Sequence, residues 1–567
     1  MVPTMAHEGS ELLPAVADVV TNTWAVRVHP EVDAEWLASL HGLKFRGPTG
    51  LSEEGPGEVF LFELVDAALN ETAGIIKLAS SLLADQLAEA AEKLEKALEG
   101  SPYVMWAQRQ VAKTRSKRAL TLPVTDPLFG SQWHLSGSHS VNAVGVWSIA
   151  TGKGVTVAVV DDGLLKNHPD IAPKFVAQGS YDFNGQDSDP SPARLDVHGT
   201  EVGGTVGAAE NNYCGIGVAP DVGLSGVRLL GGAATDVQEA QALSYKRDIN
   251  HIYSNSWGPI DDGKRFEGPG PLTYNQLISH AGRNGLGSVY VWAGGNGRAH
   301  GDNCNYDGYA NLPETIAVGA ITHDGTVSYY SESCAALITC APSSGDAQRK
   351  FGIVTDSSSS STACSSTFGG TSAAAPIVSG VVAMMLEANP NLGWRDVQGL
   401  LVHNGVRVAS TDGSWSQNGA DLWFSHDYGF GLIDASLVVP AALSWTNYPP
   451  QQRVTTSVQL RNSAAAHTFT WAVNERIIIE HTVVHLFFTT SRVGNFRLLL
   501  TSPSGMVSRL QEYHSDTSSK TLDWDYTSVA HWDEVTRGTW TISIETQSPS
   551  YPVTVNSLAI TFFGHNN

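Results

Sequence analysis

One strand-forming segment restricts the possible folds of this chain more than any other. Residues 155–160 read Val-Thr-Val-Ala-Val-Val, a continuous β-branched run without a charged residue. Such a run is typical of a strand that is covered on both faces, as in a parallel sheet. The run Ser288–Trp292 has the same character, and helical patterns at Ala374–Glu387 and Trp394–His403 alternate with such strands. The sequence therefore predicts an α/β domain with a mostly parallel sheet.

Polar residues follow both of these strands. Asp161, Asp162 and Gly163 come after the first run, and the glycine-rich segment Ala293–Gly297 contains Asn296 after the second. Open parallel sheets bind ligands beyond the carboxyl ends of their strands. We therefore expect a functional site at this edge.

The chain has 567 residues, and its hydrophobic content of 42% is enough for several cores, so two or three folded units are expected. Before the α/β domain, two strand patterns (Trp24–Val28 and Val59–Leu64) surround a short helical stretch at Glu35–Leu40. An amphipathic helix is predicted at Leu78–Leu98, and a last strand at Tyr103–Trp106. The region 22–118 therefore reads as a small α+β domain, and disorder is one expectation for the segment 1–21 before it.

The pattern of the sequence changes after about Trp445. Short alternating runs separated by turn signals follow, as is typical of an all-β sandwich; they are Val483–Phe488, Phe496–Thr501, Trp540–Ile544 and Leu558–Phe563. We expect the α/β domain at 119–445 and the sandwich at 446–567. The serine-rich tract Ser357–Ser361 reads as a flexible loop.

Charge and cysteine content exclude some functions. A formal net charge of −22 argues against nucleic acid as a partner, and it fits either a cationic partner or ordinary solubility. The five cysteines form no CxxC pair, so zinc or redox catalysis is not indicated. No stretch is expected to span a membrane. A signal peptide is not evident either, because Glu8 and Glu11 precede the mildly apolar Leu12–Val20.

Four residues have the types that amide hydrolysis requires. Ser372, near the start of a small-residue helix, would be the nucleophile, His198 the base, and Asp161 the group that orients it. The side chain of Asn296 and the backbone N–H of Ser372 would bind the oxyanion. Taken singly, each also fits a structural turn or a tight helix start. The order Asp, His, Asn, Ser favours catalysis, because the subtilisin-type triad runs in that order.

The segment Arg115-Ser116-Lys117-Arg118 lies between the N-terminal domain and the α/β domain. It reads as a cleavage signal, which the protein's own site or another protease would cut. The alternative is an uncleaved, exposed basic linker.

From about Asn22 to the C-terminus the chain resembles the kexin/furin group of subtilisin-like proprotein convertases. The resemblance is carried by several motifs in register: Asp161-Asp162-Gly163 with Asn167-His168-Pro169-Asp170, Ser254 to Pro259 with Asp261-Asp262-Gly263, Gly301 to Tyr309, and Gly370-Thr371-Ser372. It implies an inhibitory prodomain that ends at Arg118, a subtilisin-like catalytic domain, and a P domain. It also implies autocleavage after Arg118.

The resemblance implies carboxylates for basic substrate residues, since Arg and Lys are best held by charge-assisted hydrogen bonds. Asp261 and Asp307 would line the P1 pocket, and Asp162 would meet P2. The P4 site would consist of Glu239, Glu267 and Tyr309. The segment Ser256-Trp257-Gly258 would pair with the substrate backbone. Gly231 and Ala233 stand where acids are expected, so selection at P5 and P6 should be weak. The second P2 acid is displaced by one place, to Asp196.

Calcium is the implied cofactor. The acidic loop with Asp182, Asp187 and Asp189 suits a hard cation or a plain solvated turn. The resemblance implies two further sites, Asp126 with Asp170 and Asn212, and Asp261 with Asp302 and Glu332. It also pairs Cys214 with Cys364 and Cys304 with Cys334, which leaves Cys340 free. Such bridges need an oxidising compartment, so the secretory pathway is expected, in the Golgi or endosomal lumen or outside the cell. Asn70 begins a glycosylation sequon.

The expected function is a calcium-dependent serine endopeptidase that cleaves proproteins after Lys-Arg or Arg-Arg, with a preference for a basic P4 residue. Its partners would be basic-site proproteins and its own prodomain as inhibitor, with no nucleic acid and no membrane span. Two alternatives stay open. One is a degradative subtilisin-like protease of broad specificity, and the other is a non-enzymatic protein whose β domain mediates adhesion.

Overall fold

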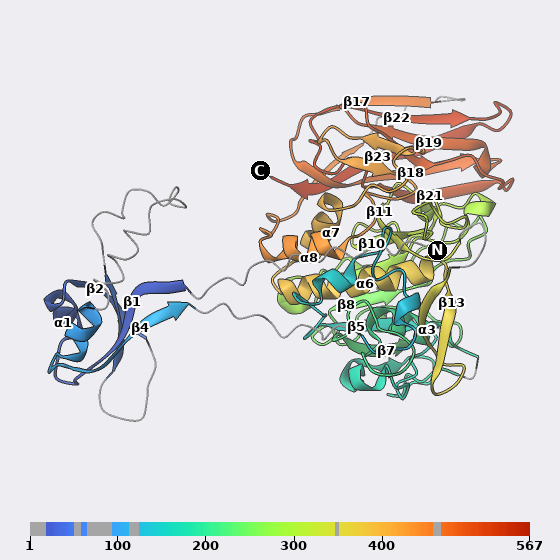
Figure 1. Cartoon of the computed structure of the whole chain (residues 1–567). Coiled ribbons are helices and arrows are strands. Elements are labelled where there is room, and N and C mark those ends of the chain that lie inside the picture. The colour runs from blue at the N-terminus through green and yellow to red at the C-terminus, as the bar shows by residue number, and fades with distance from the viewer. Residues whose placement is uncertain are drawn as a thin grey trace, which may run out of the picture. The chain divides into compact units, whose positions relative to one another are not determined.

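The computed structural model describes residues 19–49, 58–64, 93–112, 124–193, 195–345, 351–457 and 467–566. The chain divides into two compact units, Met1–Lys117 and Arg118–Asn567 (Figure 1). Three predicted features lie outside the described residues: the basic segment Arg115–Arg118, the sequon at Asn70, and most of the helix predicted at 78–98.

The first unit is a small α+β domain, as predicted. Its elements are β1 (Val19–Val28), α1 (Ala34–Leu40), β2 (Leu43–Pro48), β3 (Val59–Leu64) and β4 (Val104–Ala112). The strands form one antiparallel sheet in the order β2-β3-β1-β4. Asp33 caps α1 by accepting the N–H groups of Glu35 and Trp36, which the first turn of a helix leaves free. Residues 93–99, at the end of the predicted helix, are helical.

A seven-stranded sheet forms the centre of the second unit. Its strands are β5 (Thr156–Asp161), β6 (Tyr181–Asp182), β7 (Gly223–Arg228), β8 (Ile252–Asn255), β9 (Val289–Ala293), β10 (Thr315–Ile321) and β11 (Leu337–Pro342). All of its pairings are parallel, in the order β11-β10-β9-β8-β5-β7-β6. Val157 and Val159 of β5 pack into one hydrophobic cluster, and Ala158 and Val160 pack into another on the opposite face. Burial on both faces explains the continuous apolar run.

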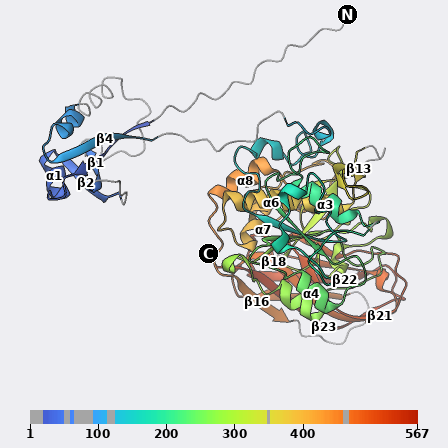
Figure 2. The ribbon, with the colours of Figure 1, turned by 90° about the horizontal axis from the view of Figure 1, so that it is seen from below.

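The α-helices that the described residues place around this sheet are α3 (His198–Gly207), α4 (Asp236–Ala242), α5 (Pro271–Leu277), α6 (Thr371–Ala388), α7 (Trp394–His403) and α8 (Ala435–Leu443). Helices α3, α6, α7 and α8 contribute to one hydrophobic cluster, and α4 and α5 to the cluster on the other face. Figure 2 shows α3 and α6 on one side and α4 on the other. The sheet is therefore covered on both sides.

Helix α6 corrects the expectation that no segment is long and apolar enough to span a membrane. By length and composition its 18 residues pass that criterion, but 83% of them are buried inside the protein. It packs against β8, β9, β10 and β11. Its apolar character is explained by its place in the core.

Among the described residues, one antiparallel strand pair lies between β11 and α6, and another lies between α7 and α8. They pair β12 (Ile353–Ser357) with β13 (Ala363–Phe368), and β14 (Trp415–Gln417) with β15 (Trp423–Ser425). The serine tract 357–361 lies at the turn between β12 and β13, so it joins two strands that the sequence pattern did not indicate.

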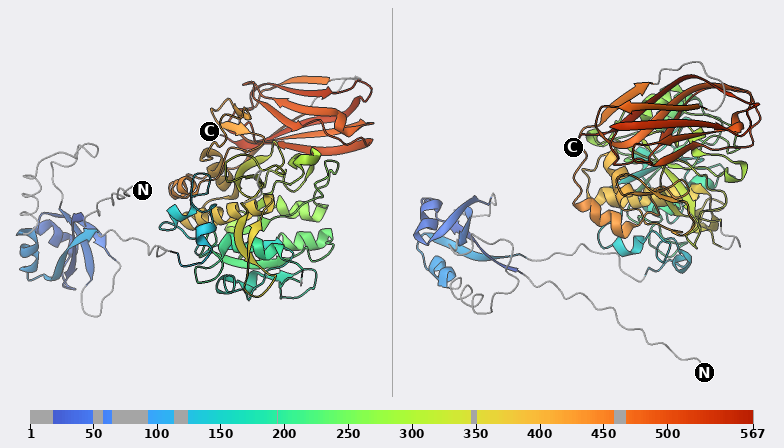
Figure 3. Two further views of the ribbon diagram at one scale, coloured as in Figure 1. Left: turned by 45° about the vertical axis from the view of Figure 1, so that its right-hand side comes forward. Right: turned by 90° about the horizontal axis from the view of Figure 1, so that it is seen from above.

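The C-terminal part is an all-β sandwich, as predicted. Its strands are β16 (Gln452–Ser457), β17 (His467–Val473), β18 (Ile478–Thr490), β19 (Phe496–Thr501), β20 (Val507–Gln511), β21 (Lys520–Ser528), β22 (Gly538–Thr546) and β23 (Val553–His565). One sheet has the order β16-β23-β18-β21, and the other β17-β22-β19-β20. Figure 3 shows the two layers in orange and red.

Asn305 joins the sandwich to the α/β domain. This residue belongs to a short 3-10 helix, η7 (Cys304–Tyr306), and its side chain is fully buried. It accepts the N–H of Thr527 at 2.8 Å and donates to the carbonyls of Leu510 and Thr527 at 3.3 and 3.1 Å. The indole of Trp524 donates to the Asn305 carbonyl at 2.7 Å. The sandwich therefore holds the segment that leads directly to Asp307.

Candidate active site

Asp161 and His198 meet at the carboxyl edge of the sheet. Asp161 ends β5 and is 1% exposed, and His198 is the first residue of α3. The Nδ1 atom of His198 lies 2.9 and 3.0 Å from the two carboxylate oxygens of Asp161. This contact requires a proton on Nδ1, so the neutral ring presents Nε2 as its proton acceptor.

Asp162 borders the same histidine. Its carboxylate accepts the N–H of Gly199 at 2.7 Å and the N–H of His198 at 3.2 Å, so it caps the start of α3. Burial and the neighbouring Asp161 raise the pKa of Asp162 to about 6. Burial lowers the pKa of His198, but Asp161 first and then Asp162 outweigh that effect and raise it to about 9.

Ser372 lies in the first turn of α6, and Asn296 lies in the loop after β9. The Oδ1 atom of Asn296 accepts the N–H of Thr371 at 2.8 Å and its hydroxyl at 3.1 Å. These two donors settle the orientation of the amide and leave its NH₂ group to donate elsewhere. The backbone N–H of Ser372 is among those that a helix start leaves without an intrahelical partner.

The hydroxyl of Ser372 donates to the carbonyl of Ser256 at 3.3 Å, and the hydroxyl of Ser256 donates to the carbonyl of Ser372 at 3.0 Å. No hydrogen bond among the described residues joins Ser372 to His198. Catalytic hydrogen bonds are often long or misaligned in a free enzyme and tighten in the substrate complex.

Two acids that the sequence analysis assigned to P1 lie at one cavity. Asp261 and Asp307 line it together with Asp302, Glu332, Gly294 and Gly295. Asp261 accepts the N–H of Asn296 at 2.8 Å, which links this cavity to the predicted oxyanion donor. Burial raises the pKa of Asp307 to about 7 and also raises that of Asp261. The Arg side chain of a substrate would supply a cation to pair with these two carboxylates.

The other predicted substrate-binding residues extend from this cavity. Tyr309 donates its hydroxyl to Glu239 at 2.6 Å, and the backbone of Glu267 bridges to Asp307. A Cβ atom on Gly258 would lie 2.6 Å from the Oδ2 atom of Asp307, so only glycine allows that carboxylate to approach.

Asp196, the displaced second P2 acid, has another partner. Its carboxylate pairs with Arg228 at 3.1 Å. Arg228 also pairs with Asp182 at 2.9 Å and donates to the backbone carbonyl of Asp162. Sequence reasoning missed this arginine. It ends the buried strand β7, and its place at the sheet edge was the one signal available.

Asp261, Asp302 and Glu332 form a group that could hold a metal ion, since one oxygen from each lies within 4.8 Å of the others. Burial and the mutual repulsion of the acids raise the pKa of Glu332 well above its ordinary value. No ion pair among the described residues neutralises them. Gly295 has φ +92° and leaves no space for a Cβ atom, which would lie 2.3 Å from Glu332. The set of hard oxygen donors fits Ca²⁺.

At the first predicted calcium site, Asn211 rather than Asn212 contacts the two acids. Asp126 and Asp170 are buried, but Asn212 is exposed, and Asn211 makes the contacts. The backbone N–H of Asn211 donates to Asp126, and its side chain donates to Asp170 at 2.7 Å. Asn211, rather than the exposed Asn212, therefore lies against the two acids, and the calcium site itself stays a prediction.

The third predicted site is the loop with Asp182, Asp187 and Asp189. Asp182 pairs with Arg228, and Asp189 pairs with Lys166 at 2.9 Å. Within the described ranges these three acids do not come together as closely as the second group does. The carboxylates of Asp182 and Asp187 both approach Gly185. A Cβ atom on Gly185 would lie 2.9 Å from Oδ2 of Asp182 and 3.3 Å from Oδ2 of Asp187.

Cys214 is bonded to Cys364, and Cys304 to Cys334. Cys340 is a free, buried thiol, and burial raises its pKa. This is the pairing that the resemblance implies.

Comparisons with known proteins agree with this architecture. Residues 152–431 match the Subtilase family, and residues 479–562 match the proprotein convertase P-domain. Rat proprotein convertase subtilisin/kexin type 4 is 39% identical over 484 residues, which cover 80% of this chain and 70% of that protein. The human protein of that name is 39% identical over 79% of this chain, and bovine furin is 38% identical over 80%.

This chain spans 62% of the length of the human relative and 59% of bovine furin. Among solved structures, the serine protease of Aeromonas sobria in complex with its chaperone superposes with a TM-score of 0.70. That match covers 79% of this chain and 96% of the other at 22% identity, so it concerns the fold alone.

The parallel sheet, the Asp–His pair at its edge and the Subtilase match define the class as subtilisin-like serine proteases. Within that class, the chain belongs to the proprotein convertases of the subtilisin/kexin type.

Proposed function

We propose that this protein is a calcium-dependent serine endopeptidase that cleaves proproteins after Lys-Arg or Arg-Arg, with an additional preference for a basic residue at P4. The observation that carries this proposal is the position of Asp261 and Asp307 at one cavity, with Asp261 hydrogen-bonded to Asn296. Charged donors form the strongest hydrogen bonds with such carboxylates.

We infer the catalytic steps from the roles assigned to these side chains. Ser372 attacks the carbonyl carbon of the scissile bond while Nε2 of His198 takes the hydroxyl proton, and Asp161 holds the proton on Nδ1. The carbonyl oxygen becomes an oxyanion that accepts hydrogen bonds from Asn296 and from the backbone N–H of Ser372. His198 then gives its proton to the leaving amine. Water, deprotonated by His198, releases the acyl group and restores Ser372.

The second acidic group, Asp261 with Asp302 and Glu332, would hold Ca²⁺ next to the P1 cavity. Bound calcium supplies positive charge that stabilises ionised carboxylates. The chain's own residues connect this group to the chemistry, because Glu332 accepts the N–H of Gly297 at 2.9 Å and Asp261 accepts that of Asn296. The group therefore positions the loop that carries the oxyanion donor.

We further propose that the prodomain 22–118 inhibits the enzyme until its own active site cuts after Arg118. Arg118 would occupy P1 at Asp261 and Asp307, Lys117 would face Asp162, and Arg115 would face Glu239 and Glu267. The two disulfides and the relatives support a location in the secretory pathway.

Two measurements test this function. Wild type and Ser372→Ala are expressed in parallel, and the mass of each N-terminus is mapped with calcium and with chelator. We expect cleavage after Arg118 in wild type alone and only with calcium. A peptide panel that varies P1 and P2 singly should then show loss of cleavage for neutral residues. Cleavage after Arg118 in isolated Ser372→Ala would contradict autoprocessing, and uniform rates across the panel would favour a degradative protease.

A further inference from the structure

The proposed nucleophile follows a turn in which one glycine is bound at both of its backbone polar groups. Gly370 comes two residues before Ser372, and its φ of +73° is a conformation that favours glycine. Its N–H donates to the hydroxyl oxygen of Tyr330 at 3.1 Å, and its carbonyl accepts the hydroxyl of Ser343 at 2.7 Å. The position of Ser372 therefore depends on two side chains that lie outside its own helix.

The hydroxyl of Tyr330 is fixed by its surroundings. The residue is 9% exposed, and its ring packs in the hydrophobic cluster that also contains residues of β5 and α6. The single hydroxyl hydrogen has two acceptors within reach, the hydroxyl of Ser343 at 2.9 Å and the carbonyl of Ser344 at 2.8 Å. With either acceptor, the tyrosine oxygen keeps a lone pair for the N–H of Gly370.

The backbone of Tyr330 contacts a second part of the proposed site. Its carbonyl accepts the N–H of Arg298 at 3.1 Å. Arg298 belongs to the loop after β9 that carries Asn296, the proposed oxyanion donor. Tyr330 therefore contacts the loop of the oxyanion donor through its carbonyl and the turn of the nucleophile through its hydroxyl.

We propose that Tyr330 is a positioning residue whose hydroxyl sets the place of Ser372 relative to the oxyanion donors. This inference rests on the proposed roles of Ser372 and Asn296. Oxyanion donors act only when they lie at hydrogen-bonding distance from the position of the charged oxygen. Ser372 supplies both the attacking oxygen and one of the donors, so a shift of the turn displaces two reacting groups together.

Replacing Tyr330 by Phe isolates the contribution of the hydroxyl. The ring and the backbone carbonyl remain, so the packing of the core and the bond to Arg298 are kept. The N–H of Gly370 loses its acceptor, and the turn before Ser372 is then free to shift. The carbonyl of Gly370 still accepts from Ser343, and Ser343→Ala removes that second bond without touching the tyrosine.

Two alternatives give different results. If the hydroxyl serves only the stability of the core, Tyr330→Phe lowers the free energy of unfolding and leaves kcat unchanged. Tyr330 also lies two residues before Glu332, an acid of the proposed calcium group. If the substitution acts through that group, the enzyme needs more calcium and recovers full activity when calcium is added.

The test uses full-length wild type, Tyr330→Phe, Ser343→Ala and the double variant, with Ser372→Ala as the unreactive reference. The values of kcat and KM are measured with an internally quenched peptide of residues 113–121. The saturating rate at which a fluorophosphonate labels Ser372 is measured in parallel, because that rate does not depend on the specificity for basic residues. Both measurements are repeated over a range of calcium concentrations.

We expect kcat and the labelling rate to fall roughly 10- to 100-fold in each single variant with little change in KM, since a misplacement of about 1 Å can cost a factor of 100. Because both side chains act on Gly370, the loss in the double variant should be smaller than the product of the single losses. Tyr329→Phe, the same substitution at an exposed neighbour, should change neither rate. The calcium concentration for half-maximal activity should stay at the wild-type value.

An unchanged kcat, a loss confined to KM, single losses that multiply in the double variant, or activity restored by calcium would overturn the proposal. An equal loss in Tyr329→Phe would overturn it as well. If Tyr330→Phe does not fold, Ser343→Ala tests the same turn, because it leaves the ring of Tyr330 in place. A wild type that is not labelled at Ser372 would instead contradict the proposed function.

Discussion

Replacing Asp162 by Asn should remove the preference for a basic P2 residue. Asp162 accepts two backbone N–H groups at the start of α3, at 2.7 and 3.2 Å. Asn keeps the shape and an oxygen that can accept the shorter bond, from Gly199. It gives up the longer contact with the N–H of His198 and the negative charge that would meet a P2 cation. A lost cap affects peptides with P2 Lys and P2 Ala alike, whereas a lost charge affects only the peptide with P2 Lys, so the ratio of the two rates reports the proposed role in specificity.

The magnitude follows from one charged hydrogen bond. Such a bond contributes about 1.5–3 kcal/mol, and about 1.4 kcal/mol corresponds to a factor of ten. The ratio of kcat/KM between P2 Lys and P2 Ala should consequently fall by roughly 10- to 150-fold. The rate with P2 Ala should change little by comparison.

The assay compares two internally quenched peptides that differ only at P2, with processed wild type, Asp162→Asn and Asp196→Asn. Asp196 is the matched control, because its carboxylate already pairs with Arg228 and it should leave the Lys/Ala ratio unchanged. An unchanged ratio in Asp162→Asn, or an equal loss in Asp196→Asn, would refute the assignment of P2 recognition to Asp162.

Three other predictions follow from the same structure. Asn296→Ala should lower kcat roughly 10²- to 10³-fold with little change in KM, because one oxyanion donor is removed; an equal rise in KM would point to substrate binding instead. His198 acts as a base only when its ring is neutral, and its pKa is raised to about 9. The value of kcat/KM should therefore fall as the pH drops through a value above the ordinary range of histidine. In Asp162→Asn this limb should move to lower pH, and an unmoved limb would contradict the electrostatic account. Asn305→Ala leaves buried partners unpaired across the sandwich junction. In the Ser372→Ala background it should lower the free energy of unfolding, measured by chemical denaturation, by about 1–3 kcal/mol for each buried polar group left unpaired. Asn556→Ala, at an exposed position, should leave that free energy unchanged.

The sequence predicted the fold well wherever burial leaves a continuous pattern. Strand β5 is apolar at every position because both of its faces are covered, and α6 is apolar because it lies in the core. The hairpin β12–β13 was missed, because its serine-rich turn and polar second strand show no alternation of apolar residues. Burial patterns reveal core elements, and they say little about exposed hairpins.

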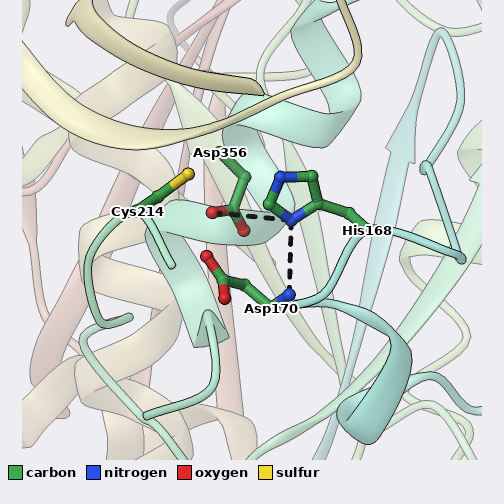
Figure 4. Close-up of side chains that lie close together, drawn as sticks. All are labelled: His168, Asp170, Cys214 and Asp356. Carbon is green, nitrogen blue, oxygen red and sulfur yellow. Dashed lines mark hydrogen bonds and ion pairs between the residues drawn. The ribbon is translucent and has the colours of Figure 1, made fainter. Parts of the chain in front are cut away.

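The candidate site was predictable in its residue types but not in its details. The order of Asp161, His198, Asn296 and Ser372 indicated the chemistry. The choice between Asn211 and Asn212 depends on a turn in the backbone, which adjacent identical residues do not reveal. Asp356 stood beside a serine tract, and nothing local indicated that it would meet His168 and Asp170 (Figure 4). Such contacts depend on how distant segments pack.

The most direct test of the proposed specificity is cleavage of a peptide with the protein's own sequence 113–121, Lys-Thr-Arg-Ser-Lys-Arg-Ala-Leu-Thr. The processed enzyme, with calcium, is given this peptide and versions with Ala at Arg118 or at Lys117, and the products are identified by mass. We predict a single cut after Arg118, nearly abolished by Ala at Arg118 and weakened at least tenfold by Ala at Lys117. Cleavage at other bonds, or equal rates for the three peptides, would contradict recognition of paired basic residues by Asp162, Asp261 and Asp307.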